Sequence, residues 1–173
     1  RHHIFGDYLK PGTPLIDVRE HGKLISACVS LGEQDVFIAS RRGIGIRFSE
    51  KSIPPNGCQG LRLAAEDEAV SIAAVDDESA VFLIAADGMG TRRLMSGFSA
   101  NKSPGGGGKL AMKTESLVGA VSVTENGDLF IISRMSKIIR FKAAEVPAKD
   151  SVVQGVICMS LRADECLAVT AAE

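Results

Sequence analysis

Residues 36–48 read Val-Phe-Ile-Ala-Ser-Arg-Arg-Gly-Ile-Gly-Ile-Arg-Phe. The same order of an apolar run, a turn and a second run that contains an arginine returns at residues 81–93 and 129–141. Two short β-rich runs joined by a polar or glycine turn predict a β-hairpin. A hairpin that recurs with a period of about 45 residues is typical of propeller-like β architectures, in which each repeat supplies one small sheet.

Each hairpin is followed by the same further elements, which are a Pro- or Gly-rich loop, a short strand, an acidic turn and a closing apolar strand. The loops fall at 53–57, 102–105 and 146–149, the short strands at 60–63, 108–112 and 155–161, and the closing strands at 69–75, 117–123 and 166–170. Residues 22–29 have the pattern of one more closing strand. No stretch shows a useful length of helical periodicity, so we predict an all-β fold.

The repeats predict a single domain over residues 1–173. Its units of four strands are expected at about 31–75, 76–123 and 124–173, with a partial unit at 1–30. Because the chain begins with Arg1 rather than Met, we expect it to be a fragment of a longer protein.

Composition excludes several classes of function. With 20 basic and 21 acidic side chains the net charge is -1, so any affinity for nucleic acid must come from where the charges lie. The four cysteines have no CxxC or His spacing, which favours small hydrophobic residues in a reducing compartment. No apolar run approaches the roughly 18 residues of a membrane span. No catalytic or metal-ligating constellation can be assembled, so we predict no catalytic residue, no metal and no cofactor in this chain.

The basic residues recur with the hairpins, whereas acidic residues collect at other turns such as 66–68 and 76–78. Arg47, Arg92 and Arg140 have the same place in each second strand. We therefore predict a basic rim of hairpins and a separate acidic face, with the rim contacting phosphates of bent duplex DNA. The predicted DNA-binding residues are Arg41, Arg42, Arg47, Arg92, Arg93, Lys102, Lys109, Lys113, Arg134, Lys137, Arg140 and Lys142. Alternatively, these side chains only keep exposed hairpins in solution.

One loop stands out by its glycines, which are Gly105, Gly106, Gly107 and Gly108, followed by Lys109. A P-loop requires Ser or Thr after the lysine and a helix beyond it, whereas here Leu110 opens a predicted strand. Two interpretations stay open. The segment is either a flexible connection between strands, or a loop whose bare backbone approaches a DNA phosphate that Lys102, Lys109 and Lys113 neutralise.

The repeats resemble the carboxy-terminal domain of the A-type chain of bacterial DNA gyrase and its topoisomerase IV counterpart. The matching segments are residues 37–48 and 130–141, Gln-Gly-Leu-Arg-Leu at 59–63 and Gln-Gly-Val at 154–156. The resemblance covers essentially the whole chain. It implies a β-pinwheel, a propeller-like disc of four-stranded blades that exchange strands with their neighbours and bind and bend DNA on a basic outer rim. The gyrase signature loop is Gln-Arg-Arg-Gly-Gly-Lys-Gly, of which residues 105–109 keep Gly-Gly-Lys and lack the Gln and both Arg.

The resemblance implies a non-catalytic DNA-binding domain of an ATP-dependent type II topoisomerase, which guides supercoiling or strand passage. Its partners would be duplex DNA, the rest of the A-type chain and, through that, the ATPase subunit. Its place would be the bacterial cytoplasm with the nucleoid, without a membrane. Wrapping of DNA as in gyrase and binding without full wrapping both stay open. A propeller-like module that binds a protein partner is the alternative, which the net charge of -1 would suit.

Overall fold

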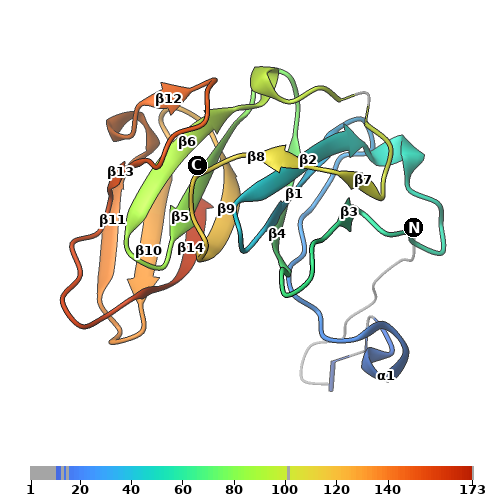
Figure 1. The fold of residues 1–173 in the computed structure, drawn as a ribbon, viewed down its shortest axis with the longest axis horizontal. Coiled ribbons are helices and arrows are strands. Elements are labelled where there is room, and N and C mark those ends of the chain that lie inside the picture. Colours follow the sequence, from blue (N-terminus) through green and yellow to red (C-terminus); the bar gives the residue numbers. More distant parts are fainter. Residues whose placement is uncertain (1–10, 13, 15, 101, 173) are drawn as a thin grey trace.

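The computed structural model describes residues 11–12, 14, 16–100 and 102–172. Three hairpins follow one another along the chain and form three sheets (Figure 1). They consist of β1 (Asp35–Ser40) and β2 (Ile44–Ser49), β5 (Ala80–Ala85) and β6 (Met89–Leu94), and β10 (Asp128–Ser133) and β11 (Ile138–Lys142). The all-β architecture with three repeated hairpins is confirmed.

A closing strand pairs antiparallel with the first strand of each hairpin. These strands are β4 (Ala69–Val75) on β1, β9 (Leu117–Val123) on β5 and β14 (Cys166–Ala172) on β10. The register of each pair shifts at the end of the hairpin strand, between Ala39 and Ser40, Ile84 and Ala85, and Ile132 and Ser133. Because this irregularity falls at the same place in all three sheets, the repeats share their local geometry as well as their topology.

The fourth strand of a sheet comes from the repeat that follows it. β8 (Lys109–Leu110) pairs with β2, and β13 (Val156–Ile157) pairs with β6. At the hairpin turns, the carbonyl oxygen of Gly43 accepts hydrogen bonds from the backbone N–H groups of Ala111 and Met112. A Cβ atom at Gly43, whose φ is 72°, would clash with the Met112 carbonyl oxygen, so the turn needs glycine. This arrangement is the strand exchange that the resemblance implies.

The remaining elements are short. β3 (Leu61–Arg62) pairs in parallel with β7 (Gly106–Gly107), and β12 (Ala148–Lys149) pairs in parallel with β6. A single α-helical turn, α1, spans Val18–His21, and a 3-10 turn follows each hairpin, namely η1 (Glu50–Ser52), η2 (Met95–Gly97) and η3 (Ala143–Glu145). Within the described residues, no helix has the length and apolar character that crossing a membrane requires.

The hydrophobic core lies between successive sheets, because β9 packs against β4 on one side and β14 on the other. Phe37 is fully buried and its ring meets that of Phe98 edge to face, with the centroids 5.2 Å apart. Phe82 meets Phe141 in the same way at 6.1 Å. Each buried aromatic ring contributes about 1.5–3 kcal/mol through burial alone, so these contacts between repeats hold the sheets in place.

The prediction of a closing strand at residues 22–29 is wrong for the structure as described. The segment forms no ladder, and the Ile72 backbone N–H donates to the Ser26 hydroxyl at 3.4 Å. Each closing strand pairs with the hairpin that precedes it, and within the described residues no hairpin precedes this segment. The segment cannot pair with β1 either, because β2 and β4 occupy both edges of that strand. Residues 1–10 of the predicted partial repeat lie outside the described residues.

The third sheet is less complete than the other two. Within the described residues it contains β11, β10 and β14, and no strand pairs with the outer edge of β11. Met135 and Ile138 at this edge are 62% and 65% exposed. In the first two repeats the corresponding edge is covered by a strand of the following repeat.

Candidate nucleic-acid interface

Three arginines occupy equivalent positions in the hairpins, as the sequence predicted. Across each hairpin, Arg47 lies opposite Phe37, Arg92 opposite Phe82, and Arg140 opposite Phe130. The equivalence is therefore confirmed at the level of strand register. The surroundings of the three guanidinium groups nevertheless differ.

Arg47 is buried, with 2% of its surface exposed. Its Nη2 atom lies 2.6 Å from Asp35 Oδ2 and 2.9 Å from Asp77 Oδ1. Its Nη1 atom donates to the carbonyl oxygens of Met95 at 3.0 Å and Phe98 at 3.2 Å. The predicted place of Arg47 on an exposed rim is wrong, because the loop of the following repeat covers the side chain and uses its donors.

Arg92 and Arg93 are also buried, with 7% and 1% of their surfaces exposed, so their predicted rim position is wrong too. Arg93 donates to the Ser151 carbonyl oxygen, and its guanidinium lies 5.4 Å from the centre of the Phe98 ring. Burial lowers the pKa of Arg93 from its ordinary value. Arg93 takes the place that a buried Phe48 has in the first hairpin, and it ties β6 to the chain around residue 151.

Basic and acidic side chains meet at the hairpin turns. Arg41 Nε lies 3.7 Å from Glu68 Oε1, and Arg134 forms an ion pair with Glu165. Lys137 Nζ lies 4.0 Å from Asp164 Oδ2. A closing strand runs antiparallel to the first hairpin strand, so the acidic turn before it lies beside the hairpin turn. The predicted separation of these acids from the basic residues is therefore wrong.

Three more predicted cations lie at the surface, one partly and two largely exposed, and are paired with carboxylates. Arg42 Nε lies 3.5 Å from Glu115 Oε2 at the tip of the first hairpin. Arg140 Nη2 lies 2.6 Å from Asp128 Oδ2, and Lys142 Nζ lies 3.2 Å from Asp128 Oδ1. The hydrogen bond from Arg140 lowers the pKa of Asp128 from its ordinary value. Exposed pairs of this kind contribute about 0–1 kcal/mol and leave the cations partly neutralised.

The glycine segment is ordered by strand pairing at both ends. Gly107 lies opposite Arg62 in the β3–β7 pair, and Lys109 lies opposite Gly45 in the β2–β8 pair. Lys109 Nζ donates to the Gly97 carbonyl oxygen and lies 4.5 Å from the centre of the Phe98 ring. The expectation of a flexible connection is therefore wrong for these residues. The bare backbone of the segment is built into the outer edge of the first sheet.

A small cavity opens at this segment. It has a volume of about 100 Å³ and is lined by Gly107, Gly108, Lys102 and Lys109 together with Phe98 and residues 45–47. A Cβ atom at Gly108 would lie 2.6 Å from the Gly45 carbonyl oxygen, whereas one at Gly107 would point into open space. The seam between the second and third repeats has a similar cavity of about 120 Å³, where Lys149 lies among the lining residues.

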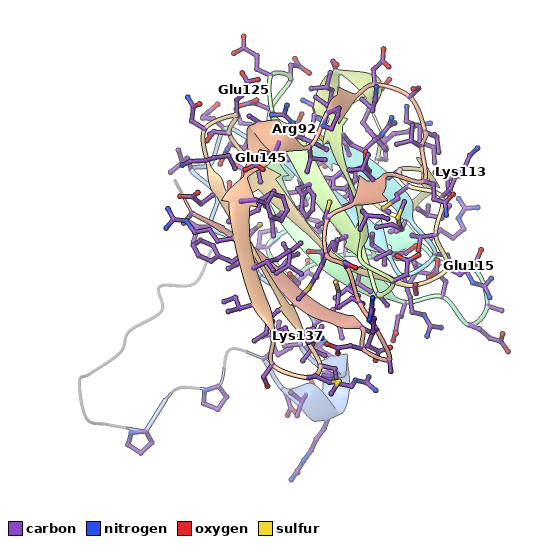
Figure 2. All side chains as sticks on the ribbon, turned by 90° about the vertical axis from the view of Figure 1, so that its left-hand side faces the viewer. Arg92, Lys113, Glu115, Glu125, Lys137 and Glu145 are labelled. Carbon is purple, nitrogen blue, oxygen red and sulfur yellow. The ribbon has the colours of Figure 1, made fainter. Side chains whose placement is uncertain are left out.

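Some exposed basic side chains have no ion-pair partner in the described part of the chain. Lys102 and Lys113 are two that the sequence predicted, and Arg62, Lys149 and Arg162 are three that it missed. Figure 2 shows Lys113 and Glu115 on the same side of the domain, and Lys137 at one end of it. The recurring hairpins and the glycine loop carry most of the predicted cations, whereas Arg62 and Lys149 lie on the short strands β3 and β12. A basic residue in a short strand next to a Pro- or Gly-rich loop is the sequence signal for such cations.

We define the outer-edge cations as Arg62, Lys102, Lys109 and Lys149. Arg62 and Lys109 flank the glycine segment by strand register. Lys102 and Lys149 line the cavities at the two seams between repeats. This set lies on the edges that carry β7, β8 and β12, it has no ion-pair partner among the described residues, and it can receive an extended anion.

Possible metal ligands are scattered in the described residues, and two of the cysteine thiols are hard to ionise. The described residues hold no group of three or more His, Cys, Asp or Glu that could bind a metal ion. Cys158 and Cys166 pack in the core between the second and third repeats, and burial raises the pKa of both thiols to about 11. Such thiols are protonated at neutral pH and are poor nucleophiles.

Comparison with known sequences identifies relatives. A family model described as the DNA gyrase C-terminal domain, β-propeller, matches residues 34–76 and 127–167. The DNA gyrase A subunit of Staphylococcus epidermidis is 29% identical over 162 residues, which take in 88% of this chain and 18% of that protein. The corresponding protein of Pseudomonas aeruginosa is 28% identical over 165 residues, covering 90% of this chain and 18% of the relative. The chain thus spans less than a fifth of the length of these relatives.

Solved structures give the fold. A DNA gyrase A C-terminal domain has a TM-score of 0.73 at 23% identity, covering 80% of this chain and 50% of that one. The C-terminal domain of DNA topoisomerase IV has a TM-score of 0.76 at 15% identity, with coverages of 82% and 47%. The fold and its exchanged strands define a repeat domain of the β-pinwheel class. The chain is a relative of the C-terminal domain of the bacterial DNA gyrase A subunit, as the sequence resemblance predicted.

Proposed function

We propose that this chain is a non-catalytic DNA-binding domain of a type II topoisomerase, within its A-type chain. It binds duplex DNA through the phosphate backbone, independently of sequence and with strong dependence on salt. The relatives named as DNA gyrase A subunits, together with the likeness to gyrase and topoisomerase IV domains, support this proposal.

The arrangement of the outer-edge cations is the single observation that carries the proposal. Lys102 and Lys109 line a cavity beside Gly107, whose backbone is open, because a Cβ atom there would meet nothing within 4 Å. Lys149 lines the equivalent cavity at the next seam. Cations spaced from one repeat to the next suit a backbone that passes along the edge of the sheets, since each contact neutralises one phosphate and releases counterions.

The buried arginines have a different part in this proposal. Arg47 and Arg93 hold loops of the following repeat, and we infer that they fix the angle between neighbouring sheets instead of contacting DNA. DNA binding therefore depends on them indirectly, through the position of the outer edges. The loop at residues 105–109 contains one lysine, whereas the gyrase signature loop also contains two arginines. We therefore propose that this domain by itself binds and bends DNA.

The wider context follows from the parent enzyme that the relatives represent. We propose that the domain acts with the rest of an A-type chain and, through it, with an ATPase subunit, in the bacterial cytoplasm near the nucleoid. Strand cleavage and ATP hydrolysis would belong to those other parts, and this domain would need no cofactor of its own. A topoisomer-shift assay on relaxed plasmid would report whether binding also wraps DNA.

The test is fluorescence anisotropy of a linear duplex titrated with the chain. The test variant replaces the four outer-edge cations by glutamine (Arg62→Gln, Lys102→Gln, Lys109→Gln and Lys149→Gln). The control makes the same change in net charge at exposed but ion-paired cations (Arg41→Gln, Arg134→Gln, Lys137→Gln and Arg140→Gln). We expect the test variant to lose at least about tenfold in affinity and the control to lose about threefold or less. Equal losses in both variants, or no binding by the unaltered chain, would overturn the proposal.

A further inference from the structure

Arg92 lacks the carboxylate that both of its repeat equivalents possess. Arg47 Nη2 lies 2.6 Å from Asp35 Oδ2, and Arg140 Nη2 lies 2.6 Å from Asp128 Oδ2. Ala80 has the position in the second hairpin that Asp35 and Asp128 have in the other two. Each of these residues is the first of its hairpin's first strand and pairs with the last residue of the second strand. The second repeat therefore keeps the arginine and has lost its internal partner.

The Arg92 guanidinium is buried and poorly satisfied. Its side chain is 9% exposed, and the one carboxylate within 4 Å among the described residues is that of Glu125, with Oε1 3.9 Å from Nη2. Arg92 Nε is buried and has no hydrogen-bond partner in the described part of the chain. Buried donors are nearly always paired, so an unpaired guanidinium donor indicates a partner that comes from outside.

The side chain lines an open cavity that such a partner can enter. The cavity has a volume of about 970 Å³ and lies where β4, β9 and β14 end. Polar groups on its walls include Ser79, Ser122 and Thr124. Figure 2 shows Arg92 and Glu125 at one end of the domain, opposite to the end that carries Lys137. Sites for small ligands commonly have volumes of about 300–1,000 Å³, so a short peptide fits this space.

The charges around the cavity select the kind of ligand. Asp76, Glu78 and Glu125 contribute carboxylates to its lining, which disfavours a polyanion such as nucleic acid. A guanidinium binds a carboxylate through two parallel hydrogen bonds. A peptide carboxylate with basic neighbours satisfies both features, because its carboxylate meets Arg92 and its cations meet the acidic rim.

We propose that Arg92 is the anchor of a peptide-binding site that takes an acidic residue flanked by basic ones from a protein partner. The site is separate from the outer-edge cations, so it stands independently of the proposed DNA binding. It gives the domain a second surface, at the end of the sheets, for a protein segment.

The test follows the Arg92 Nε–Hε signal in nitrogen-15 NMR spectra during titration with the peptide acetyl-Gly-Lys-Asp-Lys-Gly amide. We expect a saturable shift, and at least a tenfold weaker response to the same peptide with Asn in place of Asp. Inorganic phosphate and a short duplex are titrated in parallel. A tighter response to either of them than to the Asp peptide, or equal responses to the Asp and Asn peptides, would overturn the proposal.

Ala80→Asp is the decisive variant, because it restores the internal partner that Arg47 and Arg140 have. We expect it to weaken peptide binding at least tenfold while keeping the circular-dichroism spectrum, the melting temperature and the duplex affinity of the unaltered chain. Arg92→Gln should weaken peptide binding to the same extent, and Arg42→Gln, which lies outside the cavity, should not. A folded Ala80→Asp variant that binds the peptide as tightly as the unaltered chain would contradict the proposed site.

Discussion

Arg47 and Asp35 form a buried ion pair between the two strands of the first hairpin, with Nη2 and Oδ2 2.6 Å apart. The same guanidinium donates to two carbonyl oxygens of the loop at residues 95–98. One side chain thus joins the first hairpin to the second repeat. Its equivalent in the third repeat, Arg140, is 63% exposed and pairs with Asp128. A chemically identical contact therefore has two different roles in one chain.

This difference predicts unequal losses of stability. Arg47→Gln leaves a largely buried aspartate and two carbonyl oxygens without their donor, and we expect the free energy of unfolding to fall by about 3–5 kcal/mol. Arg140→Gln is the matched control and should cost about 0–1 kcal/mol. Urea unfolding followed by circular dichroism measures both. Equal losses would contradict the assignment of Arg47 to the contact between repeats.

Glycine at the hairpin turns is required by a close approach as well as by backbone conformation. A Cβ atom at Gly88, whose φ is 85°, would clash with the Met159 carbonyl oxygen, whereas one at Gly57, whose φ is 81°, would meet nothing within 4 Å. We expect Gly57→Ala to cost about 1 kcal/mol through backbone strain alone, and Gly88→Ala to cost about 3 kcal/mol or more. Thermal unfolding of the two variants should separate these contributions. Similar melting temperatures would argue against the strand exchange at this turn.

The cysteines should differ in reactivity. Burial raises the pKa of the Cys158 and Cys166 thiols to about 11, and Cys58 is exposed. At about pH 8 thiols with a pKa of about 11 are almost fully protonated, and the packing around them also hinders a reagent. We expect a disulfide reagent to modify the exposed Cys58 at least tenfold faster than Cys158 and Cys166 in the native protein. Guanidinium chloride should abolish the difference, and equal native rates would contradict the described packing.

Acid should weaken the fold through aspartates at the ends of strands, which are Asp76 after β4 and Asp128 at the start of β10. The hydrogen bond from Arg140 lowers the pKa of Asp128 from its ordinary value of 3.8, and a hydrogen bond from the Ser79 hydroxyl lowers that of Asp76. A carboxyl group whose pKa is lowered by folding stabilises the native state above its ordinary pKa, and this contribution is lost as the pH falls through the lowered value. We expect a constant melting temperature between about pH 7 and 5 and a decline below about pH 4. Asp128→Asn should reduce that decline, and a melting temperature that rises in acid would contradict this sign.

Local structure followed from the sequence, whereas burial of the charged groups did not. The hairpins and the equivalence of Arg47, Arg92 and Arg140 depend on residues close together in the chain, so alternation and turn residues reveal them. The burial of Arg47 depends on a loop about 50 residues further on, and that of Arg93 on the chain near Ser151. Segment 22–29 has strand-like residues, but it has no described hairpin to pair with.

The place of the acids could have been deduced. The closing strand pairs antiparallel with the first hairpin strand, as the partners Ser40 and Ala69 show, and this fixes the preceding acidic turn beside the hairpin turn. Topological reasoning of this kind would have predicted the pairs of Arg41 with Glu68 and of Arg134 with Glu165. The cations that remain without a partner would then have led to the outer edge.

Binding of DNA phosphates by the outer-edge cations should determine how strongly the affinity depends on salt. The association constant for a linear duplex is measured between about 50 and 200 mM salt for the unaltered chain, the variant without the outer-edge cations and the ion-paired control. Each lost phosphate contact should reduce the slope of log K against log salt by about 0.9. We predict that the outer-edge variant loses about three to four in slope and that the control changes by less than about one. An unchanged slope in the outer-edge variant would show that DNA is bound elsewhere or not by phosphate contacts at these residues.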